Sequence, residues 1–136
     1  MQPPKKVLFV CVENSARSQM AEGFLRKYSK IFEPISAGTQ PISNLNPLAI
    51  QAMKEIDIDI SNQRPKLLSN EMLNDSFKIV NMGCMDRESC PSLFVQDVID
   101  WNILDPKGKS IEDVRQIRDQ IKSEVLELIE KLEVEV

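Results

Sequence analysis

The chain of 136 residues is 42% hydrophobic and 28% charged, which is typical of one soluble globular domain spanning residues 1–136. Its net charge of −4 and pI near 4.9 argue against a nucleic-acid-binding surface, and its apolar stretches are too short to span a membrane. Three cysteines, no histidine and no recognisable secretion signal argue against a disulfide scaffold or a histidine-based site, and predict a cytoplasmic protein.

Along the first half of the chain, short apolar runs alternate with segments whose apolar residues recur at helical spacing. Residues 7–10 form an apolar run with the length of a buried strand, and apolar residues recur at helical spacing after Ser18. Asn46 followed by Pro47 is typical of a helix start, with asparagine as the cap. The predicted elements are a strand at residues 7–10, a helix from 18 to about 30, a strand at 34–37 that stops at Gly38, and a helix from Asn46 through Ile56.

The second half predicts two further strands and two helices. Residues 77–82 are mostly apolar and are bounded by Gly83, which is typical of a strand, whereas residues 96–101 alternate less cleanly. Ser110 and Asp113 resemble a capping box, and apolar residues then continue on one helical face nearly to the C-terminus. The predicted elements are a short helix at residues 69–74, strands at 77–82 and 96–101, and a last helix that begins after Ser110.

Strands that alternate with helices favour parallel pairing, because each return connection is long enough to be helical. The predicted fold class is α/β, with a four-stranded parallel open sheet flanked by helices on both faces. Open sheets of this type bind ligands beyond the carboxyl ends of their strands. Cys11, Cys84 and Asp105 each follow a predicted strand, so we expect this topology to bring them to one edge.

The segment from Cys11 to Arg17 has the pattern Cys-x5-Arg and lies between a predicted strand and a predicted helix. Backbone N–H groups in such a loop can point at one centre, and the N-terminus of the following helix adds positive potential. Arg17 adds a forked donor that suits two oxygens of a tetrahedral oxyanion. The candidate substrate-binding residues are Val12, Glu13, Asn14, Ser15, Ala16, Arg17 and Ser18.

Cys11 is the candidate nucleophile of this loop. The same N–H groups favour its thiolate, the form that attacks an electrophile, and Ser18 could donate a hydrogen bond to the sulfur. The alternative is that Cys11 is a small buried hydrophobic residue and Arg17 a surface charge, because Cys-x5-Arg alone arises easily by chance. The strand before the loop and the helix after it favour the anion site.

The loop contains no glycine, although a tight anion-binding turn usually needs a residue with positive φ. Asparagine tolerates that conformation best among the other residues, so we expect a positive φ at Asn14. The Glu13 carboxylate is unfavourable beside an anion, so we expect it to point outward into solvent.

Four segments carry a resemblance to a known family: VCVENSARSQMAEGFL, SAGT, NPLAIQAMKEIDIDIS and DPKGKSIEDVRQIRDQI. The chain resembles the low-molecular-weight protein tyrosine phosphatase superfamily and, within it, the thioredoxin-coupled arsenate reductases. The resemblance runs over nearly the whole chain and implies a four-stranded parallel sheet flanked by helices. It also implies that Cys11 attacks the oxyanion, Arg17 holds its oxygens and Asp105 protonates the leaving oxygen. Without the resemblance, a turn role before Pro106 would be favoured for Asp105.

Cys84 and Cys90 favour the reductase, because phosphatase chemistry needs only one thiol. The resemblance implies that arsenate forms an adduct on Cys11, that Cys84 attacks the Cys11 sulfur and expels arsenite, and that Cys90 then forms a disulfide with Cys84. The implied partners are arsenate, with phosphate or sulfate as mimics, and thioredoxin; no cofactor, nucleic acid or membrane is expected. The alternatives are an incidental pair of thiols or a zinc site, which the spacing and the lack of histidine disfavour.

Two other functions remain open. A low-molecular-weight phosphatase acting on phosphotyrosine or small phosphomonoesters would use the same Cys11, Arg17 and Asp105. Ala16 in place of a second loop cysteine, Lys107-Gly108 in place of tyrosines and an aromatic content of 5% count against it. A non-catalytic carrier whose loop cysteine becomes phosphorylated would gain little from a general acid.

Some reductases of this family bind a potassium ion beside the loop. Asn14, Glu22 and Ser36 match three of its side-chain ligands, but the fourth, usually aspartate, is Lys66 here. We therefore expect the Lys66 ammonium to take the place of the cation and to pair with Glu22. This predicts that activity is insensitive to potassium, and no metal site is assigned.

Overall fold

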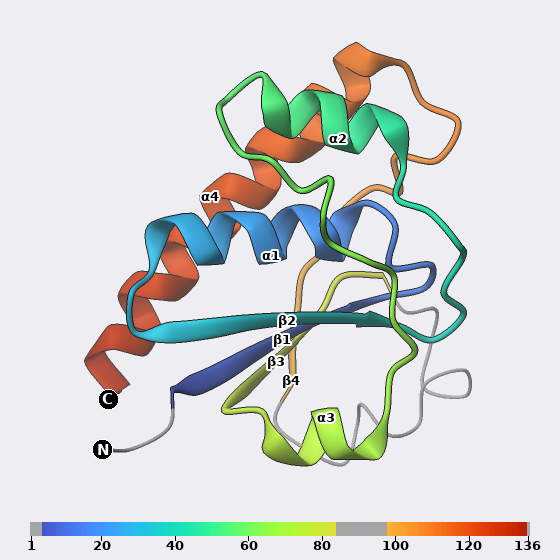
Figure 1. The fold of residues 1–136 in the computed structure, drawn as a ribbon. Helices are drawn as coiled ribbons and strands as arrows, with labels where there is room; N and C mark the ends of the chain where they lie inside the picture. The colour runs from blue at the N-terminus through green and yellow to red at the C-terminus, as the bar shows by residue number, and fades with distance from the viewer. Residues whose placement is uncertain (1–3, 84–97, 136) are drawn as a thin grey trace.

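The computed structural model describes residues 4–83 and 98–135 of the chain. Within these ranges the chain forms four strands and four helices (Figure 1). Their bounds are β1 (Lys5–Cys11), α1 (Arg17–Tyr28), β2 (Phe32–Gly38), α2 (Pro47–Lys54), α3 (Asn70–Asp75), β3 (Lys78–Asn81), β4 (Val98–Asp100) and α4 (Ile111–Glu135).

The four strands form one sheet in the order β2-β1-β3-β4, and every neighbouring pair is parallel. β1 pairs with β2 along its whole length, so that Cys11 lies opposite Gly38 where both strands end. On the other side of β1, Val10 lies opposite Asn81 of β3. The carboxyl ends of the strands therefore share one edge, and the predicted four-stranded parallel sheet is confirmed.

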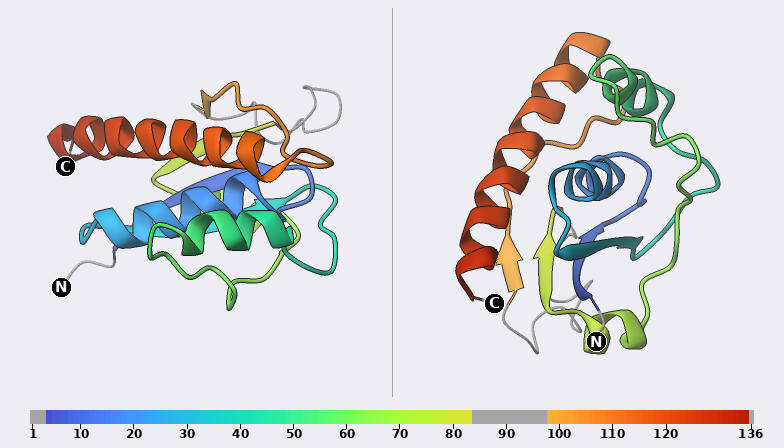
Figure 2. Two further views of the ribbon diagram at one scale, coloured as in Figure 1. Left: turned by 90° about the horizontal axis from the view of Figure 1, so that it is seen from above. Right: turned by 60° about the vertical axis from the view of Figure 1, so that its left-hand side comes forward.

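Helices cover both faces of the sheet, as predicted. α1, α2 and α4 lie on one face and α3 lies on the other (Figures 1 and 2). Alternate residues of β1 serve the two layers, because successive side chains of a strand point to opposite faces. Phe9 and Cys11 join the core formed with α1 and α4. Leu8 and Val10 pack in a second core with Leu73 of α3.

The single tryptophan of the chain lies at the end of β4. Trp101 follows the last residue of this strand, and the centroid of its ring lies 5.8 Å from that of the Phe9 ring. Its backbone N–H donates to the Asn81 carbonyl oxygen at 2.9 Å, a hydrogen bond of the last pair between β3 and β4, in which Asn81 lies opposite Asp100. Trp101 thereby fixes the start of the segment that leads to Asp105.

The predicted elements are present, with bounds that shift by a few residues. β1 begins earlier than predicted and includes Cys11, because its pairing with β2 runs from Lys5 to Cys11. α2 ends at Lys54 instead of continuing through Ile56, because the chain turns at Asp57, whose φ is 63°. The strand predicted at residues 96–101 is β4, and its first two predicted residues lie outside the described ones.

α4 is an amphipathic helix of 25 residues that packs against α1 and α2. Its buried residues recur at helical spacing, at Val114, Ile117, Arg118, Ile121, Val125, Leu128, Ile129 and Leu132. Charged side chains occupy most of its remaining surface. Across residues 4–83 and 98–135, no helix combines the length and the apolar composition of a membrane span.

Glu55 joins the end of α2 to α4. Its carboxylate accepts a hydrogen bond from Arg115 Nη2 at 2.7 Å and another from Arg118 Nη1 at 3.0 Å. The buried Arg118 also donates to the Ala52 carbonyl oxygen at 2.9 Å. Hydrogen bonding to Arg115 is the main reason that the pKa of Glu55 lies below its ordinary value of 4.5. The ionised form of Glu55 therefore stabilises the folded state.

We predict that Glu55→Gln lowers the melting temperature near neutral pH but not in acid. A carboxyl group with a lowered pKa in the folded state stabilises that state above its unfolded pKa, and this contribution is lost as the pH falls through the folded pKa. Thermal melts of the wild type and the variant should therefore differ at neutral pH and converge well below about pH 4. The exposed Glu130 of α4 offers a matched control, since Glu130→Gln should melt like the wild type throughout. A constant difference at every pH would contradict the prediction.

Candidate active site

The predicted anion loop lies between the end of β1 and the start of α1. Cys11 is only 2% exposed, and its sulfur lies 2.8 Å from Ser18 Oγ, which confirms the predicted hydrogen bond. Asn14 Nδ2 donates to Ser18 Oγ at 2.7 Å, so the serine hydroxyl is left to donate to the sulfur. The backbone N–H of Asn14 also donates to Cys11 Sγ, at 3.3 Å. Two donors therefore converge on the sulfur.

Asn14 has the predicted left-handed conformation, with a φ of 52°. The residue is fully buried, and its Oδ1 accepts from the backbone N–H of Lys66 at 2.8 Å and from Gln19 Nε2 at 3.1 Å. Gln19 also donates to the Arg64 carbonyl oxygen at 3.0 Å and accepts from Gln63 Nε2 at 2.7 Å. Sequence reasoning missed Gln19, because its partners at residues 63 and 64 lie more than 40 residues away in the chain.

The segment that follows β2 holds the carbonyl groups of the anion loop. The backbone N–H groups of residues 39, 40, 42 and 46 donate to the carbonyl oxygens of Cys11, Val12, Glu13 and Ser15 at 2.8–3.3 Å. A loop whose carbonyl groups are bound from the outside in this way can turn its N–H groups toward a common centre, as anion-binding loops do. Gly38 permits the close approach, since a Cβ there would lie 2.5 Å from the Val12 carbonyl oxygen.

Arg17 is the first residue of α1 and is buried, with 8% exposure. Its Nη1 donates to the Ile103 carbonyl oxygen at 3.2 Å, and its Nη2 lies 3.8 Å from Asp105 Oδ2. Gly83 lies directly against the guanidinium, because a Cβ built on this glycine would overlap it. The alternative reading of Arg17 as a surface charge is therefore wrong.

Asp105 lies beside Arg17, on the segment that connects β4 with α4. Its side chain is 56% exposed, and its Oδ1 accepts from the Lys107 backbone N–H at 3.0 Å. Asp105 is therefore a turn residue, while its other carboxylate oxygen faces the guanidinium. The turn position therefore does not exclude the predicted role of Asp105 as a proton donor, which stays a prediction.

Six of the predicted site residues that the structure describes line one small cavity, whereas Val12, Asn14 and Ser18 are not among its lining residues. Its lining is formed by Cys11, Glu13, Ser15, Ala16, Arg17 and Asp105. A neighbouring cavity of about 440 Å³ shares four of these residues and extends to Ile42, Leu45 and Pro47. The other two cysteines predicted for the site, Cys84 and Cys90, lie outside the described residues.

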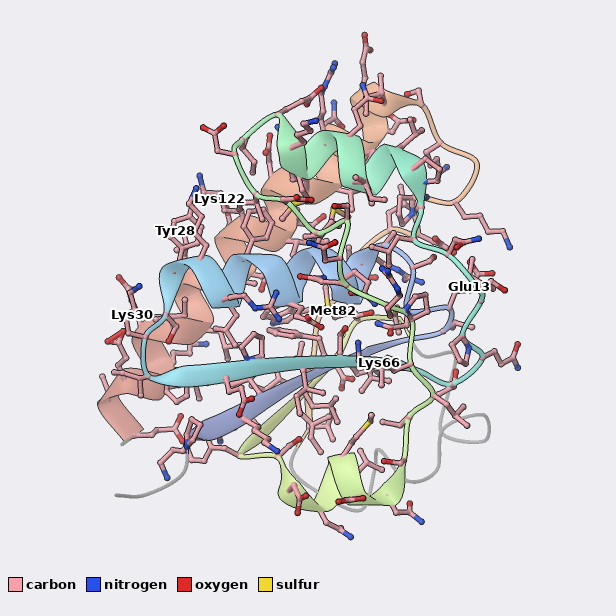
Figure 3. The ribbon with its side chains drawn as sticks, in the orientation of Figure 1. Glu13, Tyr28, Lys30, Lys66, Met82 and Lys122 are labelled. Carbon is pink, nitrogen blue, oxygen red and sulfur yellow. The ribbon has the colours of Figure 1, made fainter. Side chains whose placement is uncertain are left out.

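Glu13 lies at the side of the molecule toward which β2 points (Figure 3). Its carboxylate is not free in solvent, so that expectation is wrong. Glu13 Oε2 accepts from Lys107 Nζ at 2.9 Å, and only 25% of the Glu13 side chain is exposed. Hydrogen bonding to Glu13 is the main reason that the pKa of Lys107 is raised. The carboxylate therefore faces the turn that carries Asp105.

Lys66 lies beside β2 (Figure 3), and its Nζ is 3.8 Å from Glu22 Oε1, which confirms the predicted ion pair. Burial lowers the pKa of Lys66, and the charge of Glu22 partly offsets this effect. Other donors bind Glu22 more closely than Lys66 does. Arg26 Nη2 lies 2.7 Å from Glu22 Oε2, and Ser36 Oγ donates to Oε1 at 2.6 Å.

These contacts do not fit an added potassium ion. Asn14 Oδ1 already accepts two N–H groups, and the Glu22 carboxylate already faces Lys66, Arg26 and Ser36. Lys66 and Arg26 carry positive charges, which would repel a cation at this position. The oxygen atoms that would have to coordinate the ion are thus occupied by hydrogen-bond donors.

Known proteins resemble the chain over most of its length. Residues 6–136 match the family model described as low molecular weight phosphotyrosine protein phosphatase. The chain is 40% identical over 120 residues to an arsenate reductase of Staphylococcus xylosus, which covers 87% of this chain and 91% of that protein. It is 36% identical over 129 residues to the glutaredoxin arsenate reductase of Synechocystis sp., with coverages of 94% and 98%. The thioredoxin-dependent arsenate reductase of Corynebacterium glutamicum has a similar structure, with a TM-score of 0.84 and 30% identity over 99% of this chain and 65% of that one.

We predict that Gly83→Ala weakens oxyanion binding. A methyl group at this position would overlap the Arg17 guanidinium, so the arginine would have to leave the cavity. If the arginine fork is a main anion donor, as predicted, the dissociation constant for phosphate should rise by more than about tenfold in isothermal titration calorimetry.

Gly108→Ala is the matched control for this experiment. Gly108 also has a positive φ, of 74°, but nothing lies within 4 Å of a Cβ built on it. The control variant should lose stability through backbone strain but, because Arg17 stays in place, should lose much less affinity for phosphate than Gly83→Ala. An equal loss of affinity in both variants would show that strain, and not the displacement of Arg17, is responsible.

We also predict that potassium has no specific effect on the site. Lys66 already supplies a positive charge beside Glu22, so the dissociation constant for phosphate should agree within about twofold in potassium and sodium chloride. Choline chloride at equal ionic strength controls for charge screening. Several-fold tighter binding in potassium alone would contradict the prediction.

Proposed function

Because the chain belongs to the low molecular weight phosphotyrosine protein phosphatase family, we propose that it is an arsenate reductase that uses the cavity at Cys11. The observation that carries the proposal is the meeting of the Cys11 sulfur, the Arg17 guanidinium and the Asp105 carboxylate at this cavity. Two relatives named arsenate reductases, each aligned over at least nine-tenths of its length, support reduction among the possible oxyanion reactions.

The proposed substrate is bound by the anion loop. The N–H groups of residues 12–18 and the forked guanidinium of Arg17 surround the arsenate oxygens, as they would surround phosphate or sulfate. Burial of Arg17 strengthens these interactions, because the charge is less screened than at the surface. Local donors therefore hold a dianion on a protein whose net charge is −4.

The first step joins arsenic to the loop cysteine. The Cys11 sulfur attacks arsenic, and one arsenate oxygen leaves as water after Asp105 has donated a proton to it. The Ser18 hydroxyl and the Asn14 N–H keep the sulfur in position for this attack. Asp105 is exposed enough to recover its proton from solvent.

The second step reduces arsenic. Cys84 attacks the Cys11 sulfur, the electron pair of the sulfur–arsenic bond passes to arsenic, and arsenite leaves. Two thiols thus supply the two electrons that convert arsenic(V) to arsenic(III), and they end as a Cys11–Cys84 disulfide. Cys90 then attacks Cys84, releases the Cys11 thiolate and forms a Cys84–Cys90 disulfide. These thiol steps rest on the sequence resemblance, because Cys84 and Cys90 lie outside the described residues.

A small dithiol protein then reduces the Cys84–Cys90 disulfide by exchange. Thioredoxin is the proposed reductant, in line with the name of the Corynebacterium glutamicum protein. The name of the Synechocystis relative makes glutaredoxin the alternative. A cytoplasmic location is part of this proposal, because the relay needs a pool of reduced dithiol proteins.

Phosphatase activity is the less favoured function. It would use the same Cys11, Arg17 and Asp105, but would leave Cys84 and Cys90 without a role. The larger cavity beside the loop is lined by Ile42, Leu45 and Pro47 and by no aromatic side chain among the described residues, which does not suit a phosphotyrosine ring.

We predict that arsenate makes the protein oxidise NADPH when thioredoxin and thioredoxin reductase are present. Cys84→Ser and Cys90→Ser should each abolish this turnover, because each interrupts the relay. Both variants should keep the wild-type affinity for phosphate, since Cys11 and Arg17 are intact. Normal turnover by both variants would contradict the relay, whereas loss of phosphate binding would point to misfolding.

An assay with a second reductant tests the identity of the reductant separately from arsenate reduction itself. The same assay with glutaredoxin, glutathione and glutathione reductase tests the alternative donor. Turnover with glutaredoxin alone would replace the proposed partner and leave arsenate reduction standing. If the wild type forms no arsenite with either reductant, the proposed function is contradicted.

A further inference from the structure

One ion pair connects the anion loop to the turn that carries Asp105. Glu13 Oε2 and Lys107 Nζ lie 2.9 Å apart, although the two residues are 94 positions apart in the chain. Glu13 belongs to the loop beside Cys11, and Lys107 lies two residues after Asp105. We call this Glu13–Lys107 ion pair the clasp.

The turn beyond the clasp is itself well ordered by hydrogen bonds. The Lys107 N–H donates to Asp105 Oδ1 at 3.0 Å, and the Lys109 N–H donates to the Pro106 carbonyl oxygen at 3.0 Å. Holding the Lys107 side chain therefore also restricts the movement of the Asp105 carboxylate, because the two residues belong to one short hydrogen-bonded turn.

The position of Asp105 relative to Arg17 shows why such a constraint matters. The distance from Asp105 Oδ2 to Arg17 Nη2 is 3.8 Å, which is longer than the 2.7–2.9 Å of a direct charge-assisted hydrogen bond. If the carboxylate moved onto the guanidinium, it would occupy the fork that an oxyanion needs. If it moved away, it could not reach an oxygen of the bound anion.

We propose that the clasp positions Asp105 at the mouth of the oxyanion cavity and that Lys107 cancels the charge of Glu13 toward the oxyanion. Glu13 and Lys107 are thus positioning residues that act through Asp105 and through the field at the cavity. The proposal rests on the proposed arsenate reduction for the role of Asp105, but its electrostatic part depends only on oxyanion binding.

The charges around the cavity support the second part. Glu13 lines both the small cavity at Cys11 and the larger one beside it, and Lys107 lines the larger one. An unpaired Glu13 carboxylate would repel a dianion, whereas an unpaired Lys107 ammonium would attract it. Removing one partner or the other should therefore change oxyanion affinity in opposite directions.

An ordinary surface ion pair would behave differently. The Lys107 side chain is 70% exposed, and exposed pairs usually contribute little to stability. An incidental pair therefore predicts that substitutions at Glu13 and Lys107 leave both affinity and rate unchanged. The proposed role of the ion pair therefore depends on the position of the clasp beside the cavity, and not on its contribution to stability.

The test compares Glu13→Gln, Lys107→Gln and the charge-swapped double variant Glu13→Lys/Lys107→Glu with the wild type. Phosphate affinity is measured by calorimetry, and arsenite release is measured in a single turnover of fully reduced protein without added reductant. Lys107→Gln should weaken phosphate binding about fivefold and Glu13→Gln should tighten it by a similar factor. Both single variants should release arsenite about fivefold more slowly, and the swap should restore the rate to within about twofold.

Lys109→Gln is the matched control, because Lys109 is an exposed lysine of the same turn. It should match the wild type in affinity and rate, and thermal melts should show that all variants are folded. Unchanged rates in both single variants, or a swap that stays slow, would overturn the positioning role. Phosphate affinities that shift in the same direction or not at all would overturn the electrostatic role. If the wild type releases no arsenite, the proposed function fails, and the phosphate affinities still decide the role of the two charges.

Discussion

The shape of the site depends on the hydrogen bonds that the segment after β2 donates to the anion loop. Four N–H groups of this segment bind carbonyl oxygens of the loop, and the segment reaches them because β1 and β2 end side by side at Cys11 and Gly38. The loop contains no glycine, so its backbone path is set by these four hydrogen bonds and by the left-handed conformation of Asn14. A side chain on Gly38 would push the two segments apart.

Local features of the site could be predicted because they depend on neighbouring residues. The strand before Cys11, the helix at Arg17, the positive φ of Asn14 and the Ser18 hydrogen bond all follow from patterns within a few positions of the loop. Parallel pairing then brought Asp105 to the same edge, since its segment follows the end of β4.

The features that the sequence did not reveal join distant segments. Gln19 hydrogen-bonds to residues 63 and 64, Gly83 lies against Arg17, and Glu13 pairs with Lys107. Each contact depends on how closely two distant segments of the chain approach each other, and the spacing of residues within one segment does not predict this. The outward orientation expected for Glu13 failed for this reason, because its partner is 94 positions away.

Trp101 gives the protein a built-in optical reporter. It is the single tryptophan of the chain, its ring lies against Phe9, and its backbone is tied to Asn81 at the end of β3. Phe9 precedes Cys11 by two residues on the same face of β1, and the chain runs from Trp101 through Ile103, which contacts Arg17. The tryptophan fluorescence of the unlabelled protein therefore originates from one known place, beside the core and on the segment that leads to the cavity at Cys11, and needs no dye or engineered probe.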